Sequence, residues 1–284
     1  MRYAVIIPTL NPGKALKALL EAMRRQTARP EEILIVDSCS DDGTAEGIRQ
    51  EQGVRVISVK REEFDHGGTR DMALRTCAVP FVVFLTQDAL PAEETCMEEL
   101  LKPFEDPRVA AVCGRQMAHP EAKRAEKAVR AFRYPEGNTV WEKADIPRLG
   151  VRAFLLSDVC AAYRVSAYEA AGGFTHPLTT NEDMLMAADL LEAGYKLAYQ
   201  GSAKVWHSHN YTLGQEYERN RKIGEFLAQY GDRFGSVTGE GFALVKHVVS
   251  TLAKEGRIPE IFAFGANCGA RLLGNRRGRR QHGK

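Results

Sequence analysis

A carboxylate at the end of a buried strand has the clearest chemical use in this sequence. Residues 80–85 (Pro-Phe-Val-Val-Phe-Leu) carry no polar side chain, and the apolar run stops at Thr86, Gln87 and Asp88. In open α/β sheets, ligands bind beyond the carboxyl ends of the strands. The sequence therefore predicts that Asp88 reaches the ligand-binding edge of a sheet.

A second group of acids follows another predicted strand, residues 32–37. Asp37, Asp41 and Asp42 fall within six residues of one another. An acid at such a turn can hydrogen-bond a ribose or a base, whereas capping of the next helix needs one acid only. We predict that Asp37 contacts a nucleotide and that Asp41 or Asp42 caps the helix or supports that pocket. No Gly-x-Gly-x-x-Gly motif follows the first strand, which argues against an NAD or FAD site.

A glycine-rich segment, residues 64–71, precedes a predicted helix. Gly67 and Gly68 permit a close approach of the backbone to a ligand, and a helix N-terminus beside Arg70 suits a diphosphate. The same residues also fit an ordinary loop, in which Thr69 or Gly68 caps the helix and Arg70 pairs with a surface acid. Composition favours neither interpretation.

Glu182 and Asp183 open a predicted helix after Asn181. Acids in a first turn are favoured by the helix dipole alone, but one of these carboxylates could also serve as a general base for an acceptor hydroxyl. His207 and His209 alternate at the end of a predicted strand, which places both imidazoles on one side. Such a pair can bind a metal, although a lone histidine is more often structural.

These residues need a scaffold, and the first half of the chain predicts one by alternating short β-rich runs with helical segments. This alternation is typical of βαβ units in a parallel sheet. Strands are predicted at residues 3–8, 32–37, 54–59, 80–85, 109–113, 154–163 and 196–207. Helices are predicted at about residues 13–26, 41–52, 68–77, 121–134, 181–193, 213–230, 242–253 and 259–273, with another after Pro91. Right-handed crossovers would place Thr9, Asp37 and Asp88 along one edge, and residues 118–150 are predicted to form a loop-rich lid or acceptor region.

Composition limits the class of protein. The net charge of +2 over 284 residues is not that of a nucleic-acid-binding protein. The six cysteines form no Cys-x-x-Cys pair, which favours free thiols in a reducing compartment. No uncharged run approaches the roughly 20 residues of a spanning helix, and no signal peptide is evident. We expect a cytoplasmic protein or one on the cytoplasmic face of a membrane.

The C-terminal helices carry two apolar sets followed by basic residues from Arg271 onward. Packing against the rest of the chain or against a second copy in a homodimer is the commoner explanation for such apolar sets. The basic tail favours a second interpretation, attraction to an anionic membrane surface, because apolar insertion plus positive charge supplies two anchoring signals.

In their order along the chain these motifs resemble an inverting family 2 glycosyltransferase of the GT-A fold, over residues 1 to about 210. The motifs are Ile6–Asn11, Val36–Ser38 with Asp41–Thr44, Asp88, and Asn181–Asp183 with Gly194–Lys196. The resemblance implies an α/β fold with a Rossmann-like, mostly parallel sheet flanked by helices. The implied domains are a glycosyltransferase domain (1–210, with a nucleotide-binding half 1–115 and an acceptor-binding half 116–210) and a C-terminal helical extension (211–284).

Residues 64–71 and 206–209 more narrowly resemble bacterial rhamnosyltransferases that build cell-surface polysaccharides. The resemblance implies that rhamnose moves from dTDP-rhamnose to a saccharide or lipid-linked acceptor. UDP-hexose or UDP-hexosamine is the alternative donor, and a nucleotidyltransferase or a degenerate nucleotide-binding regulator is the alternative class. The chain has no Gln-x-x-Arg-Trp motif, which favours addition of one sugar over processive synthesis.

The resemblance also implies roles for individual residues. Asp183 matches the catalytic base and Glu182 its neighbour. Asp88, with His207, would hold Mg²⁺ or Mn²⁺, although Thr86 stands where the family usually has an acid. The implied nucleotide-sugar-binding residues are Pro8, Thr9, Asn11, Asp37, Asp41, Asp42, His66, Gly68, Arg70, Gln87 and Asp88.

Overall fold

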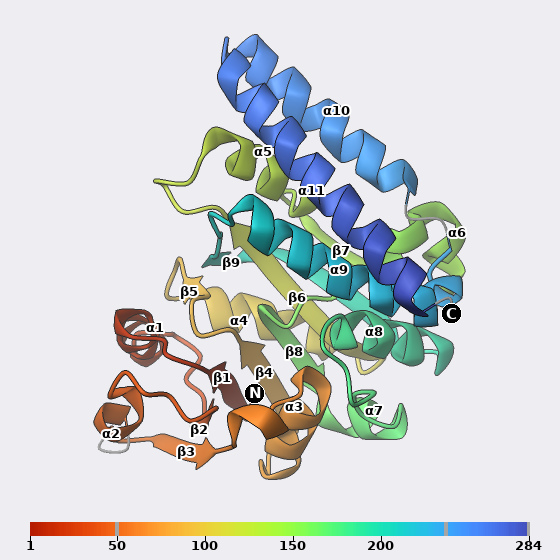
Figure 1. Cartoon of the computed structure of the whole chain (residues 1–284). Helices are drawn as coiled ribbons and strands as arrows, with labels where there is room; N and C mark the ends of the chain where they lie inside the picture. The colour runs from red at the N-terminus through yellow and green to blue at the C-terminus, as the bar shows by residue number, and fades with distance from the viewer. Residues whose placement is uncertain (49–50, 236–237, 283–284) are drawn as a thin grey trace. The chain divides into compact units, whose positions relative to one another are not determined.

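The computed structural model describes residues 1–48, 51–235 and 238–282, which form two compact units (Figure 1). The sheet unit comprises residues 1–116, 136–145 and 154–207. The helical unit comprises residues 117–135, 146–153 and 208–284. The further division of residues 1–210 into a nucleotide-binding and an acceptor-binding half concerns function and stays a prediction.

The sheet unit is built on a mixed sheet, whose order in the described residues is β3-β2-β1-β4-β8-β6-β9-β5, with β7 pairing with β9. The strands are β1 (Tyr3–Thr9), β2 (Glu32–Asp37), β3 (Val54–Ser58), β4 (Phe81–Leu85), β5 (Leu90–Pro91), β6 (Val109–Met117), β7 (Asn138–Trp141), β8 (Cys160–Arg164) and β9 (Lys196–Trp206). Strands β1 to β4 run parallel, whereas β8 is antiparallel to β4 and β6 is antiparallel to β8. The predicted α/β class with a mostly parallel first half is confirmed.

The register brings the carboxyl ends of three strands to one edge. Thr9 pairs with Asp37 at the ends of β1 and β2, and Ile6 pairs with Phe84 in β4. Because these strands are parallel, the loops that follow them leave the sheet on the same side. The predicted parallel arrangement behind Thr9, Asp37 and Asp88 is therefore confirmed.

Strand β4 is buried along its whole length, as its apolar sequence requires for a strand covered on both faces. Helix α1 (Lys14–Arg24) buries Leu16, Leu19, Leu20 and Met23, which recur at the helical spacing of one face. The other helices of this unit are α2 (Thr44–Ile48), α3 (His66–Arg75), α4 (Cys96–Leu101), α7 (Val165–Ala170) and α8 (Glu182–Glu192).

Some predicted elements are wrong in extent. The predicted strand 154–163 is confined to β8, because residues 150–154 form a 3-10 helix and the polar Ser157 and Asp158 interrupt the apolar run. Residues 138–141 form strand β7 inside a region predicted to lack sheet. Only Trp141 of that strand is buried, so its sequence carries little strand signal. Helix α2 (Thr44–Ile48) begins later than predicted, and residues 51–53 are not helical, so the predicted helix end near residue 52 is wrong; residues 49 and 50 lie outside the described residues.

Helix α3 begins two residues earlier than predicted, because Asp65 supplies its cap. The Asp65 carboxylate accepts a hydrogen bond from the Gly68 N–H at 2.5 Å. It also accepts one from the Leu178 N–H at 2.5 Å, which ties α3 to the segment before α8. The predicted caps, Thr69 and Gly68, are therefore wrong.

The helical unit contains α5 (Arg124–Arg133), α6 (Ile146–Leu149), α9 (Leu213–Tyr230), α10 (Thr238–Lys254) and α11 (Ile258–His282). Helices α9 and α11 pack closely at Gly224, Gly274 and Gly278, where a Cβ atom would collide with backbone of the facing helix. Helix α10 packs against α5 through Val248, Leu252 and Ala128. In the described part of the chain, no helix is both long and apolar enough to cross a membrane.

Candidate active site

Asp37 closes the end of β2 and is 2% exposed. Its Oδ1 accepts hydrogen bonds from the hydroxyls of Ser40 at 2.5 Å and Thr9 at 3.3 Å. Its Oδ2 accepts one from the Ser40 N–H at 3.0 Å. These contacts hold the carboxylate in one orientation at the sheet edge, and its role toward a nucleotide stays a prediction.

Side chains of the neighbouring loops are tied to one another around Asp37. Asn11, held at φ +48°, accepts a hydrogen bond from the Asp41 N–H at 2.9 Å. Asp42 accepts one from the Gly13 N–H at 2.9 Å and one from the Thr44 N–H at 3.0 Å, so it both starts α2 and joins two loops. Asparagine tolerates this left-handed conformation better than most residues. The acids after β2 thus shape the edge of the sheet as well as the helix start.

Gln87 connects the loop after β4 to the loop after β1. Its side-chain amide exchanges two hydrogen bonds with the backbone of Leu10, at 2.8 and 3.2 Å. Pro8, the residue before Thr9 in β1, pairs with Val36 of β2. Hydrogen bonds and strand pairing therefore join the segments at the ends of β1, β2 and β4, which carry the predicted nucleotide-binding residues.

Asp88 and His207 form the candidate metal centre. Asp88 Oδ1 lies 3.7 Å from His207 Nε2. The two ligand atoms are close enough to share one ion. In the described chain, the buried hydroxyl of Thr86, two residues before Asp88, has no hydrogen-bond partner. Carboxylate and imidazole ligands with an additional oxygen suit Mn²⁺ or a similar divalent cation.

Gln116, a residue not predicted from the sequence, orients the His207 ring. Its Oε1 lies 3.0 Å from His207 Nδ1, and its Nε2 donates to Ser157 Oγ at 2.9 Å. The bond to Ser157 leaves the Gln116 carbonyl oxygen facing the ring, where it can accept a hydrogen bond from an Nδ1–H of His207. In that tautomer the lone pair of Nε2 faces Asp88, as a metal ligand requires.

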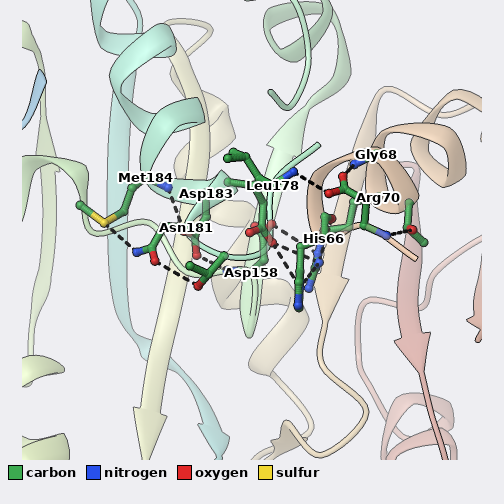
Figure 2. A network of polar contacts seen from close by, with 12 residues as sticks. His66, Gly68, Arg70, Asp158, Leu178, Asn181, Asp183 and Met184 are labelled. Carbon is green, nitrogen blue, oxygen red and sulfur yellow. Dashed lines mark hydrogen bonds and ion pairs between the residues drawn. The ribbon is translucent and has the colours of Figure 1, made fainter. Parts of the chain in front are cut away.

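A second acidic group lies at the start of α8 (Figure 2). Glu182 is 5% exposed, Asp183 is partly exposed, and Asp158, from the segment before β8, is 3% exposed. Asp183 Oδ1 accepts a hydrogen bond from the Met184 N–H at 2.8 Å, and Oδ2 accepts one from the Asp158 N–H at 3.4 Å. Asn181 takes a left-handed conformation and makes no side-chain cap, so the Asp183 carboxylate bonds the helix start itself.

The pKa values of Asp183 and Asp158 are raised. Loss of solvent around its carboxylate, together with the charges of Glu182 and Asp158, raises the pKa of Asp183 well above its ordinary value. Burial raises the pKa of Asp158 to about 7 against the opposing effect of Arg70. A carboxylate with a raised pKa is a better general base near neutral pH.

At Gly67 the glycine-rich segment packs closely against the backbone of another segment of the protein. A Cβ atom there would lie 2.5 Å from the Thr175 carbonyl oxygen. His66, whose side chain is 45% exposed, lies 3.8 Å from Glu182. Arg70 is 4% exposed, and its guanidinium lies 3.1 Å from Glu182. The predicted diphosphate contacts of Gly68 and Arg70 stay predictions.

Asp158 was not predicted from the sequence either. One signal was available, because Asp158 lies between the apolar residues 154–156 and 159–163, where an acid is costly unless it is paired. Gln116 carried a weaker signal, a polar side chain near the end of an apolar strand.

Known proteins share this sequence and fold. Residues 4–172 match the family described as Glycosyl transferase family 2. An O-antigen chain rhamnosyltransferase from Salmonella typhimurium is 39% identical over 258 residues, covering 89% of this chain and 82% of the relative. A second one, from Salmonella anatum, is 42% identical over 257 residues, covering 89% of this chain and 81% of the relative.

Solved structures agree on the fold. A mannosyltransferase from Pyrobaculum calidifontis, in complex with GDP-Man and Mn²⁺, has a TM-score of 0.64 at 18% identity and covers 96% of this chain and 84% of its own. Staphylococcus aureus TarS in complex with UDP-GlcNAc has a TM-score of 0.60 at 17% identity and covers 80% of this chain and 66% of its own. The predicted GT-A fold is confirmed. The chain belongs to glycosyltransferase family 2 and is an inverting glycosyltransferase of polysaccharide synthesis.

Proposed function

We propose that this enzyme transfers rhamnose from dTDP-rhamnose to a saccharide or lipid-linked acceptor, with Asp183 as the general base. The observation that carries the proposal is the setting of Asp183, a carboxylate of raised pKa at the N-terminus of α8. The rhamnosyltransferases at 39% and 42% identity support the choice of sugar.

In this reaction Asp183 accepts the proton of the acceptor hydroxyl as its oxygen bonds to the anomeric carbon. The bond from that carbon to the nucleoside diphosphate breaks on the opposite face, so the configuration inverts. Asp88 and His207 would hold a divalent cation, which supplies charge stabilisation for the departing diphosphate when bound. Asp37 and Gln87 keep the loops around the nucleotide in place through the contacts described above.

The donor is tested by thermal unfolding with nucleotide sugars, with and without Mn²⁺. Because a ligand that binds only the folded state stabilises it by an amount that rises with the logarithm of its concentration relative to Kd, dTDP-rhamnose at about 100 times its Kd should add roughly 2.7 kcal/mol to the free energy of unfolding. UDP-glucose and UDP-N-acetylglucosamine at equal concentration serve as controls. A shift with a UDP sugar and none with dTDP-rhamnose would contradict the choice of donor while leaving the enzyme class intact.

We also propose that the helical unit contacts an anionic membrane surface. Phe242 of α10 and Phe262 of α11 are 78% and 75% exposed. Further along α11, Arg276, Arg277, Arg279 and Arg280 are exposed, and basic side chains near an anionic surface contribute about 1 kcal/mol each. Apolar and basic groups exposed on one helix match the chemistry of that surface.

Flotation with vesicles tests this contact. The protein should float with phosphatidylglycerol vesicles, and replacing both Phe242 and Phe262 by Ser should weaken binding more than about tenfold, since each ring contributes about 1.5–3 kcal/mol when buried. Val140→Ser, at a residue 51% exposed in the sheet unit, is the control. Equal binding to neutral phosphatidylcholine vesicles, or full binding by the double variant, would show that these residues do not anchor the protein.

A further inference from the structure

Arg70 is a buried cation that faces carboxylates of the protein. It lies in α3, and its Nη1 lies 3.1 Å from Glu182 Oε1 while its Nε lies 3.5 Å from Asp158 Oδ2 (Figure 2). Nη1 also donates to the His66 carbonyl oxygen at 3.0 Å, and the guanidinium carbon lies 5.9 Å from the centre of the Phe84 ring. Because a buried charge is costly without a partner, the acids are what keep Arg70 in this position.

The charges around Arg70 do not cancel. Three carboxylates, those of Asp158, Glu182 and Asp183, act on the single guanidinium. Asp158 Oδ2 and Arg70 Nε are buried without a hydrogen-bond partner in the described residues, so their charges alone bind them to each other. Tyr163 satisfies the other oxygen, since its hydroxyl donates to Asp158 Oδ1 at 2.6 Å. The group therefore depends on Arg70 to remain ionised.

We propose that Arg70 is a positioning residue for the catalytic base: it holds Glu182 and Asp158 next to Asp183 and offsets their negative charge. This inference rests on the proposed role of Asp183. The connection is direct, because Glu182 precedes Asp183 in the chain and the Asp158 N–H donates to Asp183 Oδ2 at 3.4 Å. The proposal gives Arg70 a different role from the diphosphate contact that its motif predicts.

The opposite charges of Arg70 and Asp158 predict in which direction the pKa of Asp183 changes when either charge is removed. The titratable and charged groups around Asp183 are His66 and Arg70 from α3, Cys113 from β6, Asp158 from the segment before β8, Tyr163 from β8, and Glu182 from α8. Removing the positive charge of Arg70 makes the ionised form of Asp183 less favourable and raises its pKa. Removing the negative charge of Asp158 has the opposite effect and lowers it.

The pH dependence of kcat/KM in Arg70→Gln and Asp158→Asn tests the proposal. Activity needs ionised Asp183, so it is lost as the pH falls through the pKa of that group. We expect this acid limb to move up by about one pH unit in Arg70→Gln and down by about one in Asp158→Asn. Arg70→Lys should return the limb toward wild type. Arg75→Gln, on the same helix but with its side chain 52% exposed, should leave the limb in place.

Binding of the nucleoside diphosphate separates the two roles of Arg70. In Arg70→Gln its Kd should stay within about twofold of wild type, measured by calorimetry. A weaker Kd with an unmoved acid limb would show that Arg70 binds the diphosphate and would overturn the proposal. If Arg70→Gln does not fold, the pH profile of Asp158→Asn tests the proposal in its place. An acid limb at the wild-type position in Asp158→Asn would also overturn the proposal. A different result would show that the proposed function itself is wrong: the Asp183→Asn variant would keep full activity.

Discussion

Asp183→Asn should lower kcat by about 10²- to 10⁴-fold, the contribution expected of a general base. The amide keeps the size of the carboxyl group, and its one oxygen can still accept the hydrogen bond from the Met184 N–H, so the start of α8 should remain in place; only the longer bond from the Asp158 N–H loses its acceptor. The amide cannot accept the proton of an acceptor hydroxyl. The loss should therefore fall on turnover, whereas the donor should bind with nearly unchanged Kd.

Single-turnover kinetics and donor binding by calorimetry measure the two effects separately. Glu192→Gln is the matched control, because it removes an exposed acid from the other end of the same helix. Folding stability gives a further check. Asp183 ionises less readily in the folded protein, so neutralising it removes an unfavourable charge and should not lower the melting temperature at neutral pH. Wild-type turnover in Asp183→Asn would show that the base is another group.

Asp88→Asn should lower kcat by about a hundredfold or more and weaken Mn²⁺ binding. A divalent cation beside a departing diphosphate contributes several kcal/mol, and about 1.4 kcal/mol is a factor of ten in rate. The substitution removes the carboxylate of the candidate metal centre while His207 keeps its contact with Gln116. The reaction should therefore need far more Mn²⁺ in the variant than in the wild type.

Electron paramagnetic resonance of Mn²⁺ gives the affinity without any reaction, and rates at a series of Mn²⁺ concentrations give its effect on turnover. Glu105→Gln, at an exposed acid of the same unit, controls for the loss of one negative charge. An Asp88→Asn variant with unchanged Mn²⁺ affinity would show that Asp88 is not a ligand. Lower activity that excess Mn²⁺ does not restore would point instead to loss of a donor contact.

Local sequence patterns predicted a strand well where its own residues form a continuous apolar run. Residues 32–37 form β2 as predicted, and residues 80–85 differ from β4 by one residue, because continuous apolar runs leave no other way to bury these side chains. Strand β7 and the limits of β8 were not predictable in this way. They depend on pairing with β9 and β4, partners distant in the sequence, and such pairing leaves little trace in local composition.

For the site, the sequence determined which side chains end strands and open helices, so Asp37, Asp88 and Asp183 could be named from order and spacing. It also placed Arg70 in the first turn of a helix, which suggested an anion as its partner. The fold instead pairs Arg70 with Glu182 and Asp158, and it places Gln116 against His207. These partners come from α3, β6, the segment before β8 and α8, which the chain order does not make neighbours. The charge that each acid carries depends on this burial and pairing, and both exist only once the sheet has formed.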